Sequence, residues 1–430
     1  MPCAMCSRCR YVQTEQGGIP RLVPYFAACF CTVTNSGGLI LGAGPFSECL
    51  IREGYVRAVE TPIIFTGAFQ IMTWGSVLAV HLDNRLGPRL SAILGACIEL
   101  AGHATLATLP KPANPYLVMA AYGLVGWGGN QIFFTCFQFA RLFPDNIGLA
   151  DGGLTGSWAL AGGVFLVLNA PGLTIERLFT IMGFVSAGVL LTCLVLWPDQ
   201  AYTKREPVSV TWPSCRHAKN PFATQSYQGH FHCLSNARFL LYALTFSWSC
   251  LVSTYVSGSL IIYQRTGRMG EFYMKWAYPI IVNSEFLLTW SIGHFIDRTG
   301  FAAVVLALFL CCFMSLLCLS ATHSALAAWG NLVMINFTMS IQYTLQFAFL
   351  HKALPKEAYH AGLIVVLITQ GLIGFIANPG LSPNPWGEDY IPPASIIAVM
   401  GLPLLAWPLL EWKYYTNRTD FEVHTASSLE

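Results

Sequence analysis

Two short charged segments of this 430-residue chain repeat one another at a fixed distance. Residues 81–89 read HLDNRLGPR and residues 293–300 read GHFIDRTG, and Arg85 stands 213 positions before Arg298. The acid of such a segment can meet both a helix N-terminus and a cation on a neighbouring helix. The repeat predicts a duplicated chain with one charged turn in each half. We assign Arg85 and Arg298 to a gate at the face that carries these turns.

Two further cations repeat at nearly the same distance. Arg141 and Lys352 each lie three residues before a proline and stand 211 positions apart. In the first half we predict a contact between Arg141 and Asp83, or Asn84 beside it. In the second half the equivalent contact joins Lys352 to Asp297, and both contacts belong to the predicted gate. The alternative interpretation is that these cations only anchor loops at the inner face of a membrane.

Polar side chains with the same repeat distances fall near the middle of long apolar runs. Gln70 and Asn283 are 213 positions apart, and Gln131 and Gln342 are 211 apart. Transporter sites form at mid-membrane where two repeats meet, so these amides are predicted to bind a substrate. In the alternative interpretation they only bond packed helices to one another. Residues at similar depth or helical spacing complete the predicted site: Asn35, Ser36, Thr135, Ser249, Asn336 and Tyr343.

Three ionisable side chains also lie within apolar runs. Glu99, with His103 one turn later, and Glu285 are candidate proton relays, because an ionisable group in lipid is costly. The alternative for the first pair is packing polarity, with a protonated Glu99 bonded to His103. Glu285 and Asn283 differ by about 200° around a helix, so they cannot both face one cavity squarely. This geometry favours uniport over proton symport.

Several absences narrow the chemistry. No lysine or arginine lies in the middle of an apolar run, which disfavours strongly anionic substrates. No HExxH or GxSxG motif is present, so we do not predict an enzyme. Cys3, Cys6 and Cys9 could hold a metal, but beside a membrane this run suits palmitate better. We therefore predict neither a cofactor nor a metal site.

The composition sets the elements that must position these residues. The chain is 54% hydrophobic and only 10% charged, which excludes a water-soluble surface. Its long apolar runs show no apolar/polar alternation, and only helices or closed barrels span lipid. The fold class predicted is an all-α membrane protein with about 12 transmembrane helices in two six-helix bundles. The predicted spans are 22–44, 62–82, 90–109, 115–140, 147–170, 177–197, 238–263, 273–296, 301–320, 324–350, 358–378 and 393–411.

The spans divide the chain into five parts. If the N-terminus lies in the cytoplasm, the segments on the cytoplasmic side of the spans hold 16 of the 23 lysines and arginines. This excess predicts that both termini lie in the cytoplasm. The polar stretch in the middle has no apolar period and is predicted to be a cytoplasmic linker. The parts are a tail at 1–21, a six-helix bundle at 22–197, the linker at 198–237, a second bundle at 238–411 and a tail at 412–430.

The second charged turn resembles the loop motif of the major facilitator superfamily, roughly G-x-L-x-D-R-x-G-R/K. The first turn departs from that motif, because Asn84 stands where the acid is expected and Val80 where the first glycine is expected. The resemblance implies a transporter of two helical bundles whose first, fourth, seventh and tenth helices line a central cavity, with a peripheral third helix. The matching residues of the second turn are Gly293, Phe295, Asp297, Arg298 and Gly300.

Within that superfamily, some segments are similar to the solute carrier family 43 branch, which includes facilitators of large neutral amino acids. They are 38–46, 53–55, 142–144 and 148–149. The resemblance implies a secondary transporter of a small neutral or zwitterionic solute, an amino acid, moved by alternating access. The alternatives are a proton-coupled symporter of a sugar, nucleoside or monocarboxylate, and a non-transporting receptor or scaffold. We expect a monomer in the bilayer of a plasma or organelle membrane, with a small-molecule substrate and no nucleic acid.

Overall fold

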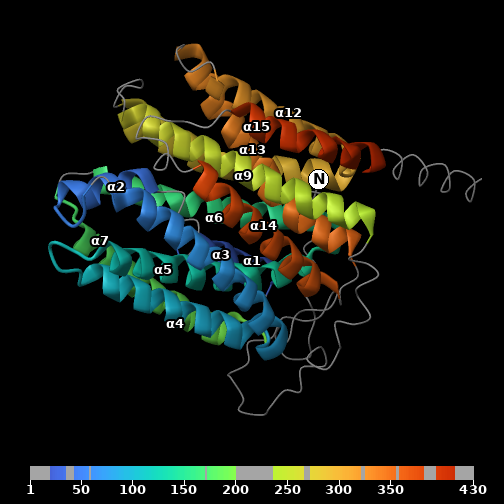
Figure 1. Cartoon of the computed structure of the whole chain (residues 1–430). Helices are drawn as coiled ribbons and strands as arrows, with labels where there is room; N and C mark the ends of the chain where they lie inside the picture. The colour runs from blue at the N-terminus through green and yellow to red at the C-terminus, as the bar shows by residue number, and fades with distance from the viewer. Residues whose placement is uncertain are drawn as a thin grey trace, which may run out of the picture. The chain divides into compact units, whose positions relative to one another are not determined.

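The computed structural model describes residues 20–34, 43–57, 60–169, 172–199, 236–265, 272–320, 325–354, 358–381 and 394–411. Every regular element within these ranges is a helix, as the sequence predicts (Figure 1). The chain divides into two compact units, Met1–Gln225 and Ser226–Glu430. Asn35, Ser36, the cysteines of the N-terminal tail and most of the predicted linker lie outside the described residues.

The first unit is built from long helices joined by short turns. Two 3-10 segments, Phe137–Leu142 and Gly162–Asn169, extend its fifth and sixth α-helices. The helices are α1 (Leu22–Thr34), α2 (Ala43–Arg52), α3 (Thr61–Leu86), α4 (Pro88–Ala107), α5 (Pro115–Cys136), α6 (Ile147–Ala161) and α7 (Ile175–Leu196).

The second unit has the same style of construction. Its α10 is preceded by a π-helical turn, Tyr273–Ala277, and its α15 is followed by a 3-10 turn, Leu402–Leu405. The helices are α9 (Ala237–Arg265), α10 (Tyr278–Asn283), α11 (Glu285–Thr299), α12 (Ala302–Ser320), α13 (Ala325–Ala353), α14 (Tyr359–Leu381) and α15 (Ala394–Gly401).

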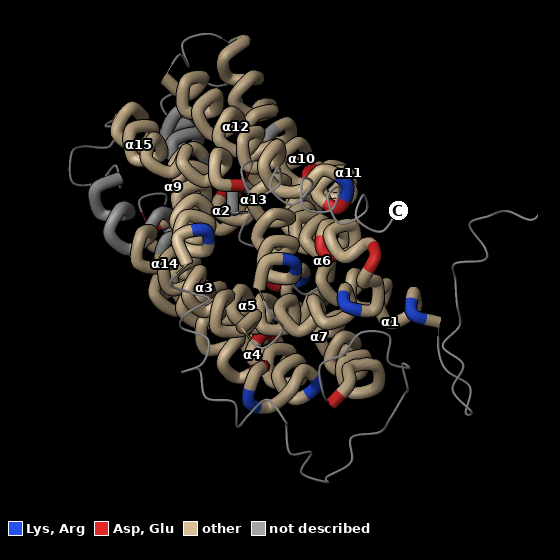
Figure 2. Tube along the Cα trace, turned by 90° about the vertical axis from the view of Figure 1, so that its right-hand side faces the viewer, with Lys and Arg blue, Asp and Glu red and all other residues tan. Residues whose placement is uncertain are grey.

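The surfaces of these helices suit lipid. Seven helical segments of the described chain are long and apolar enough to cross a membrane. Large apolar side chains such as Phe184 and Leu326 point outward, at 77% and 82% exposure. Figure 2 shows how sparsely charged residues interrupt the tan tube of each unit. Exposed apolar side chains on long helices are stable only in an apolar solvent, so the helices are membrane spans.

Both charged turns have one backbone conformation. Gly87 ends α3 with φ of 82° and Gly300 ends α11 with φ of 79°. Each glycine donates its N–H to the carbonyl four residues earlier, Asp83 in the first unit and Ile296 in the second. Side chains with a Cβ rarely adopt this left-handed region, so the repeated glycine is required by the turn. We call the side of each unit that carries this turn its loop-motif side.

Close packing of glycines joins α4 to α5. A Cβ on Gly128 would lie 2.5 Å from the backbone nitrogen of Glu99 and 2.5 Å from the carbonyl oxygen of Gly95. A Cβ on Gly102 would lie 2.8 Å from the carbonyl oxygen of Ala121. The two helix backbones therefore touch. This arrangement is typical of membrane helices, which associate through the close packing that small residues allow and not through the hydrophobic effect.

Two of the predicted spans differ from the helices of the structure. The first, 22–44, covers α1 and the start of α2, and α2 runs on to Arg52, whose guanidinium donates to the Leu168 carbonyl. The eighth span, 273–296, is not one α-helix. Pro279 lacks a backbone N–H and cannot donate to the turn before it, which explains the π-helical turn that precedes α10.

Candidate functional site

The loop-motif side of the second unit carries an ion pair. The Lys352 Nζ of α13 lies 2.7 Å from an Asp297 carboxylate oxygen of α11, and it also donates to the Ile296 carbonyl at 3.4 Å. The side chains of Lys352 and Asp297 are 29% and 10% exposed. The contact joins two helices of one unit. In the proposed gate, the pair holds α11 in position against α13.

The equivalent residues of the first unit lie at matching helix ends. Asp83 and Asn84 are in the last turn of α3, and Arg141 is in the 3-10 segment that follows α5. Arg85 is exposed beside them, and Arg298 occupies the equivalent place at the end of α11. The contact between Arg141 and Asp83 or Asn84 stays a prediction.

A buried arginine connects helices on the loop-motif side of the first unit. Arg89, at the start of α4, is 1% exposed and lies 3.0 Å from the Asp199 carboxylate. Its Nε donates to the carbonyl of Trp197, the residue that directly follows α7. The Trp197 indole N–H in turn donates to the Thr135 hydroxyl of α5 at 2.8 Å. This network fastens α4, α5 and α7 to one another.

The second unit repeats the pattern with other residues. Arg238, at the start of α9, forms a bidentate pair with Glu411, with the Nη2 contact at 2.8 Å. The indole N–H of Trp407 donates to the same carboxylate at 3.0 Å. Trp197 and Trp407 are fully buried and stand 210 positions apart, each with an acid a few residues after it. Sequence reasoning missed both networks, although that repeated spacing could have revealed them.

Two predicted substrate residues of the first unit bond within that unit. The Gln131 amide nitrogen donates to the Ser91 carbonyl at 3.1 Å, so this side chain faces α4. Thr135 donates to the Ile132 carbonyl and accepts from Trp197. Gln70 is half-buried on α3, and its amide oxygen has no hydrogen-bond partner among the described residues. The contacts of Gln131 and Thr135 agree with the alternative that they bond packed helices.

The predicted residues of α9 and α13 are more closely grouped. Gln342 is fully buried, and its amide oxygen accepts from Ser253 at 3.2 Å. Ser249, one turn before Ser253, donates to the Phe246 carbonyl. A void beside Gln342 and Tyr242 is too narrow for a water molecule. This part of the second unit is closed in the structure, and the Gln342 amide is held by a neighbouring hydroxyl.

Glu99 and His103 lie inside the first unit. Both are fully buried, and the His103 Nε2 is 3.4 Å from a Glu99 carboxylate oxygen. The imidazole lies 5.7 Å from the Phe179 ring of α7, and the Glu99 backbone lies against Gly128 of α5. The pair is thus covered by α5 and α7. Its carboxylate oxygens and ring nitrogens have no hydrogen-bond partner among the described residues, and both interpretations of the pair stay predictions.

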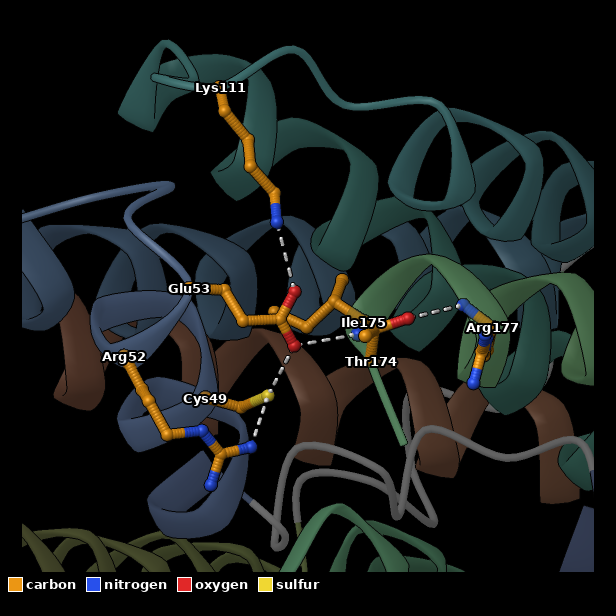
Figure 3. A network of polar contacts seen from close by, with 7 residues as sticks. All are labelled: Cys49, Arg52, Glu53, Lys111, Thr174, Ile175 and Arg177. Carbon is orange, nitrogen blue, oxygen red and sulfur yellow. Dashed lines mark hydrogen bonds and ion pairs between the residues drawn. The ribbon is translucent and has the colours of Figure 1, made fainter. Parts of the chain in front are cut away.

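A polar network on the opposite side from the loop motif surrounds Glu53 (Figure 3). Its carboxylate accepts from the Cys49 thiol at 3.0 Å, from the backbone N–H of Ile175 at 3.1 Å and from Lys111 at 3.2 Å. Arg52 donates to the Cys49 sulfur. The network connects the end of α2, the turn after α4 and the first turn of α7, so it fixes three helix ends to each other.

The surroundings of Glu53 shift its ionisation. Burial alone would raise the pKa of the Glu53 carboxyl, but the hydrogen bonds from Cys49, Ile175 and Lys111 hold this pKa below its ordinary value. A carboxyl whose pKa is lower in the folded protein stabilises the fold above its unfolded pKa. This contribution is lost as the pH falls through the folded pKa.

Replacement of Glu53 by glutamine is therefore expected to destabilise the first unit by about 1–3 kcal/mol at neutral pH, because it removes charge-assisted hydrogen bonds. The difference from the wild type should shrink as the pH falls below the ordinary glutamate pKa of about 4.3 and then through the lower pKa of the folded protein. Thermal unfolding of the purified protein across this pH range measures both effects. Glu60→Gln is the matched control, because its partner Arg57 is 79% exposed. Equal losses in the two variants would contradict a special role for Glu53.

Comparison with known proteins defines the fold. The structure of the proton:xylose symporter XylE, bound to 6-bromo-6-deoxy-D-glucose, superposes with a TM-score of 0.62 at 13% identity, covering 92% of this chain and 96% of that chain. The crystal structure of a variant of the E. coli fucose:proton symporter FucP gives a TM-score of 0.60 at 15% identity, covering 91% of this chain and 99% of that chain. This likeness confirms the predicted all-α membrane fold.

Sequence comparison gives a relative and a family. Protein FMP42 of Saccharomyces cerevisiae is 26% identical over 201 residues, and the match spans 41% of this chain and 40% of FMP42. The chain thus matches less than half the length of this relative. The model of the Major Facilitator Superfamily matches residues 28–378, most of the chain, which therefore belongs to that family of multi-pass membrane transporters.

Proposed function

We propose that this secondary transporter carries a small neutral or zwitterionic solute by uniport. We infer that the solute is an amino acid, as the resemblance to the solute carrier family 43 branch implies. The observation that supports this most directly is the chemistry of its spans. No lysine or arginine lies in mid-span, whereas buried amides are present in both units. A zwitterion carries its own compensating charge and needs no fixed cation, unlike a phosphate or a di-acid.

Uniport is favoured by how few groups can carry a proton. Glu99 and His103 are enclosed by helices of the first unit, which leaves Glu285 as the remaining relay predicted from the sequence. A single buried carboxylate can serve substrate binding as well as proton transfer. Proton-coupled symport of a sugar is the second candidate, because Glu285 is fully buried and both similar solved structures are named as proton symporters.

The proposed orientation follows the distribution of cations. Of the 23 lysines and arginines, 16 fall on the inner segments when both termini are cytoplasmic. In this orientation the loop-motif side faces the cytoplasm, and the Lys352–Asp297 pair closes that side when the transporter opens outward. We propose a monomer in a plasma or organelle membrane.

Uptake into proteoliposomes tests the substrate and the coupling together. We expect labelled large neutral amino acids to enter saturably and to stop at equal inner and outer concentrations, with no response to an imposed pH step. Sugars and nucleosides in the same panel should not exceed empty liposomes. Accumulation above the outer concentration that depends on the pH step, and that Glu285→Gln abolishes, would establish symport instead.

A further inference from the structure

The junction between α10 and α11 lies against one face of α13. Both α10 and α11 pack on α13 within the second unit. The Asn336 side-chain nitrogen of α13 donates to the Ser284 hydroxyl at the junction at 3.2 Å. Glu285 directly follows Ser284 in the chain and begins α11. We call Ser284, Glu285 and the facing Asn336 of α13 the junction site.

The junction site contains buried acceptors without donors. Both carboxylate oxygens of Glu285 lack a hydrogen-bond partner among the described residues, and the side chain is only 1% exposed. The amide oxygen of Asn336, which is 8% exposed, also lacks a partner within the described part of the chain. A buried acceptor left without a donor costs about 1–3 kcal/mol, and a carboxylate costs more. A ligand that brings donors and positive charge would satisfy both acceptors, whereas without a ligand the carboxyl avoids the cost of a buried charge by taking up a proton.

The local chain favours a negative charge at this position. Glu285 occupies the first turn of α11, where the helix dipole stabilises a carboxylate. The cations Arg298 and Lys352 lie about four turns away along α11 and α13, at the loop-motif side. Among the described side chains of α11 and α13 no cation lies beside the junction site, so a ligand with its own positive charge and N–H donors suits it.

We propose that the junction site binds the ammonium group of the substrate, with Glu285 as the counter-ion and the Asn336 amide oxygen as a second acceptor. An ammonium group offers three donors and one positive charge, which matches a carboxylate and an amide oxygen. This inference rests on the proposed function, because it assigns one end of the proposed zwitterion to a place in the second unit.

Binding to the purified full-length protein tests the assignment. The probes are leucine, its des-amino analogue 4-methylpentanoate, its decarboxylated analogue isopentylamine, and sodium chloride, each scored by its effect on thermal stability. We expect leucine and isopentylamine to stabilise the wild type and 4-methylpentanoate to have no effect. In Glu285→Gln the apparent affinity for both amines should fall about 10- to 100-fold, the loss expected for a charge-assisted hydrogen bond.

Two further variants provide a second test of the site and a control. Asn336→Ala should weaken amine binding less than Glu285→Gln, and it provides a second reading if that variant does not fold. Ser315→Ala is the control, because Ser315 is a buried hydroxyl of the same unit that bonds to Asn331 on a different helix contact. Its amine affinity should equal that of the wild type.

The outcomes separate the site from the proposed function. Wild-type leucine affinity in Glu285→Gln and Asn336→Ala would overturn the junction site and leave amino-acid transport standing. Glu285-dependent binding of isopentylamine by a protein that takes up no amino acid would sink the proposed function and keep the site. Stabilisation by sodium chloride that Glu285→Gln abolishes, without any effect of the amines, would replace the ammonium site with one for an inorganic cation.

Discussion

Gly128→Ala is expected to destabilise the first unit by about 1–3 kcal/mol, and Gly128→Leu to prevent its folding. The added Cβ would lie 2.5 Å from both the Glu99 nitrogen and the Gly95 oxygen. These are backbone atoms of α4, which cannot rotate away as a side chain can. The two helices would have to separate along their whole contact and lose close packing, the main cause of association between membrane helices.

Thermal unfolding of purified Gly128 variants, followed by size-exclusion chromatography after heating, measures this loss. Gly188→Ala is the control, because no atom of the described residues lies within 4 Å of a Cβ built on Gly188 of α7. This variant should unfold at the wild-type temperature or slightly above it, since alanine favours a helix more than glycine does. Equal stability of Gly128→Ala and Gly188→Ala would show that α4 and α5 do not depend on this contact.

Asp297→Asn is expected to shift the conformational equilibrium toward the state open on the loop-motif side, by about 1–3 kcal/mol or 5- to 150-fold in population. The change keeps the shape of the side chain but leaves Lys352 without its charged partner 2.7 Å away. A fully buried pair would cost more, but Lys352 is 29% exposed and water compensates part of the loss. Labelling of a cysteine introduced on the loop-motif side measures the shift.

Exchange of the two charges provides the control for this experiment. The double variant Asp297→Lys with Lys352→Asp should recover part of the wild-type labelling, because the attraction returns with reversed polarity. Lys352→Gln alone should shift labelling in the same direction as Asp297→Asn. Unchanged labelling in both single variants would leave only the interpretation that Lys352 anchors the loop at the membrane surface.

The sequence determined the solvent, the fold class and the charged turns. Helices follow from apolar runs of span length, because in lipid every backbone group must bond within its own segment. The turns at Gly87 and Gly300 follow from local chemistry, since only a glycine adopts their φ without strain. Asp297 and Lys352 could be paired from spacing alone, because each lies at a helix end on the same side of the unit.

Only the tertiary structure decided which way each polar side chain faces. The sequence places Gln131 at mid-membrane depth, and the structure shows that its amide nitrogen bonds to Ser91 of a neighbouring helix. Thr135 likewise accepts the indole N–H of Trp197. Hydropathy gives the depth of such residues in the membrane but not their direction. Direction depends on how each helix rotates against its neighbours, and in lipid close packing of small residues sets that rotation.

The interruption at Pro279 and the junction site were likewise decided by packing. The proline explains the π-helical turn before α10, but the sequence does not say which residues of α13 face the start of α11. Ser284 and Asn336 are 52 residues apart and are hydrogen-bonded only because α11 and α13 pack together. Arg89 and Asp199 are joined in the same way across 110 residues. Such pairs depend on contacts between distant helices, which local sequence patterns do not record.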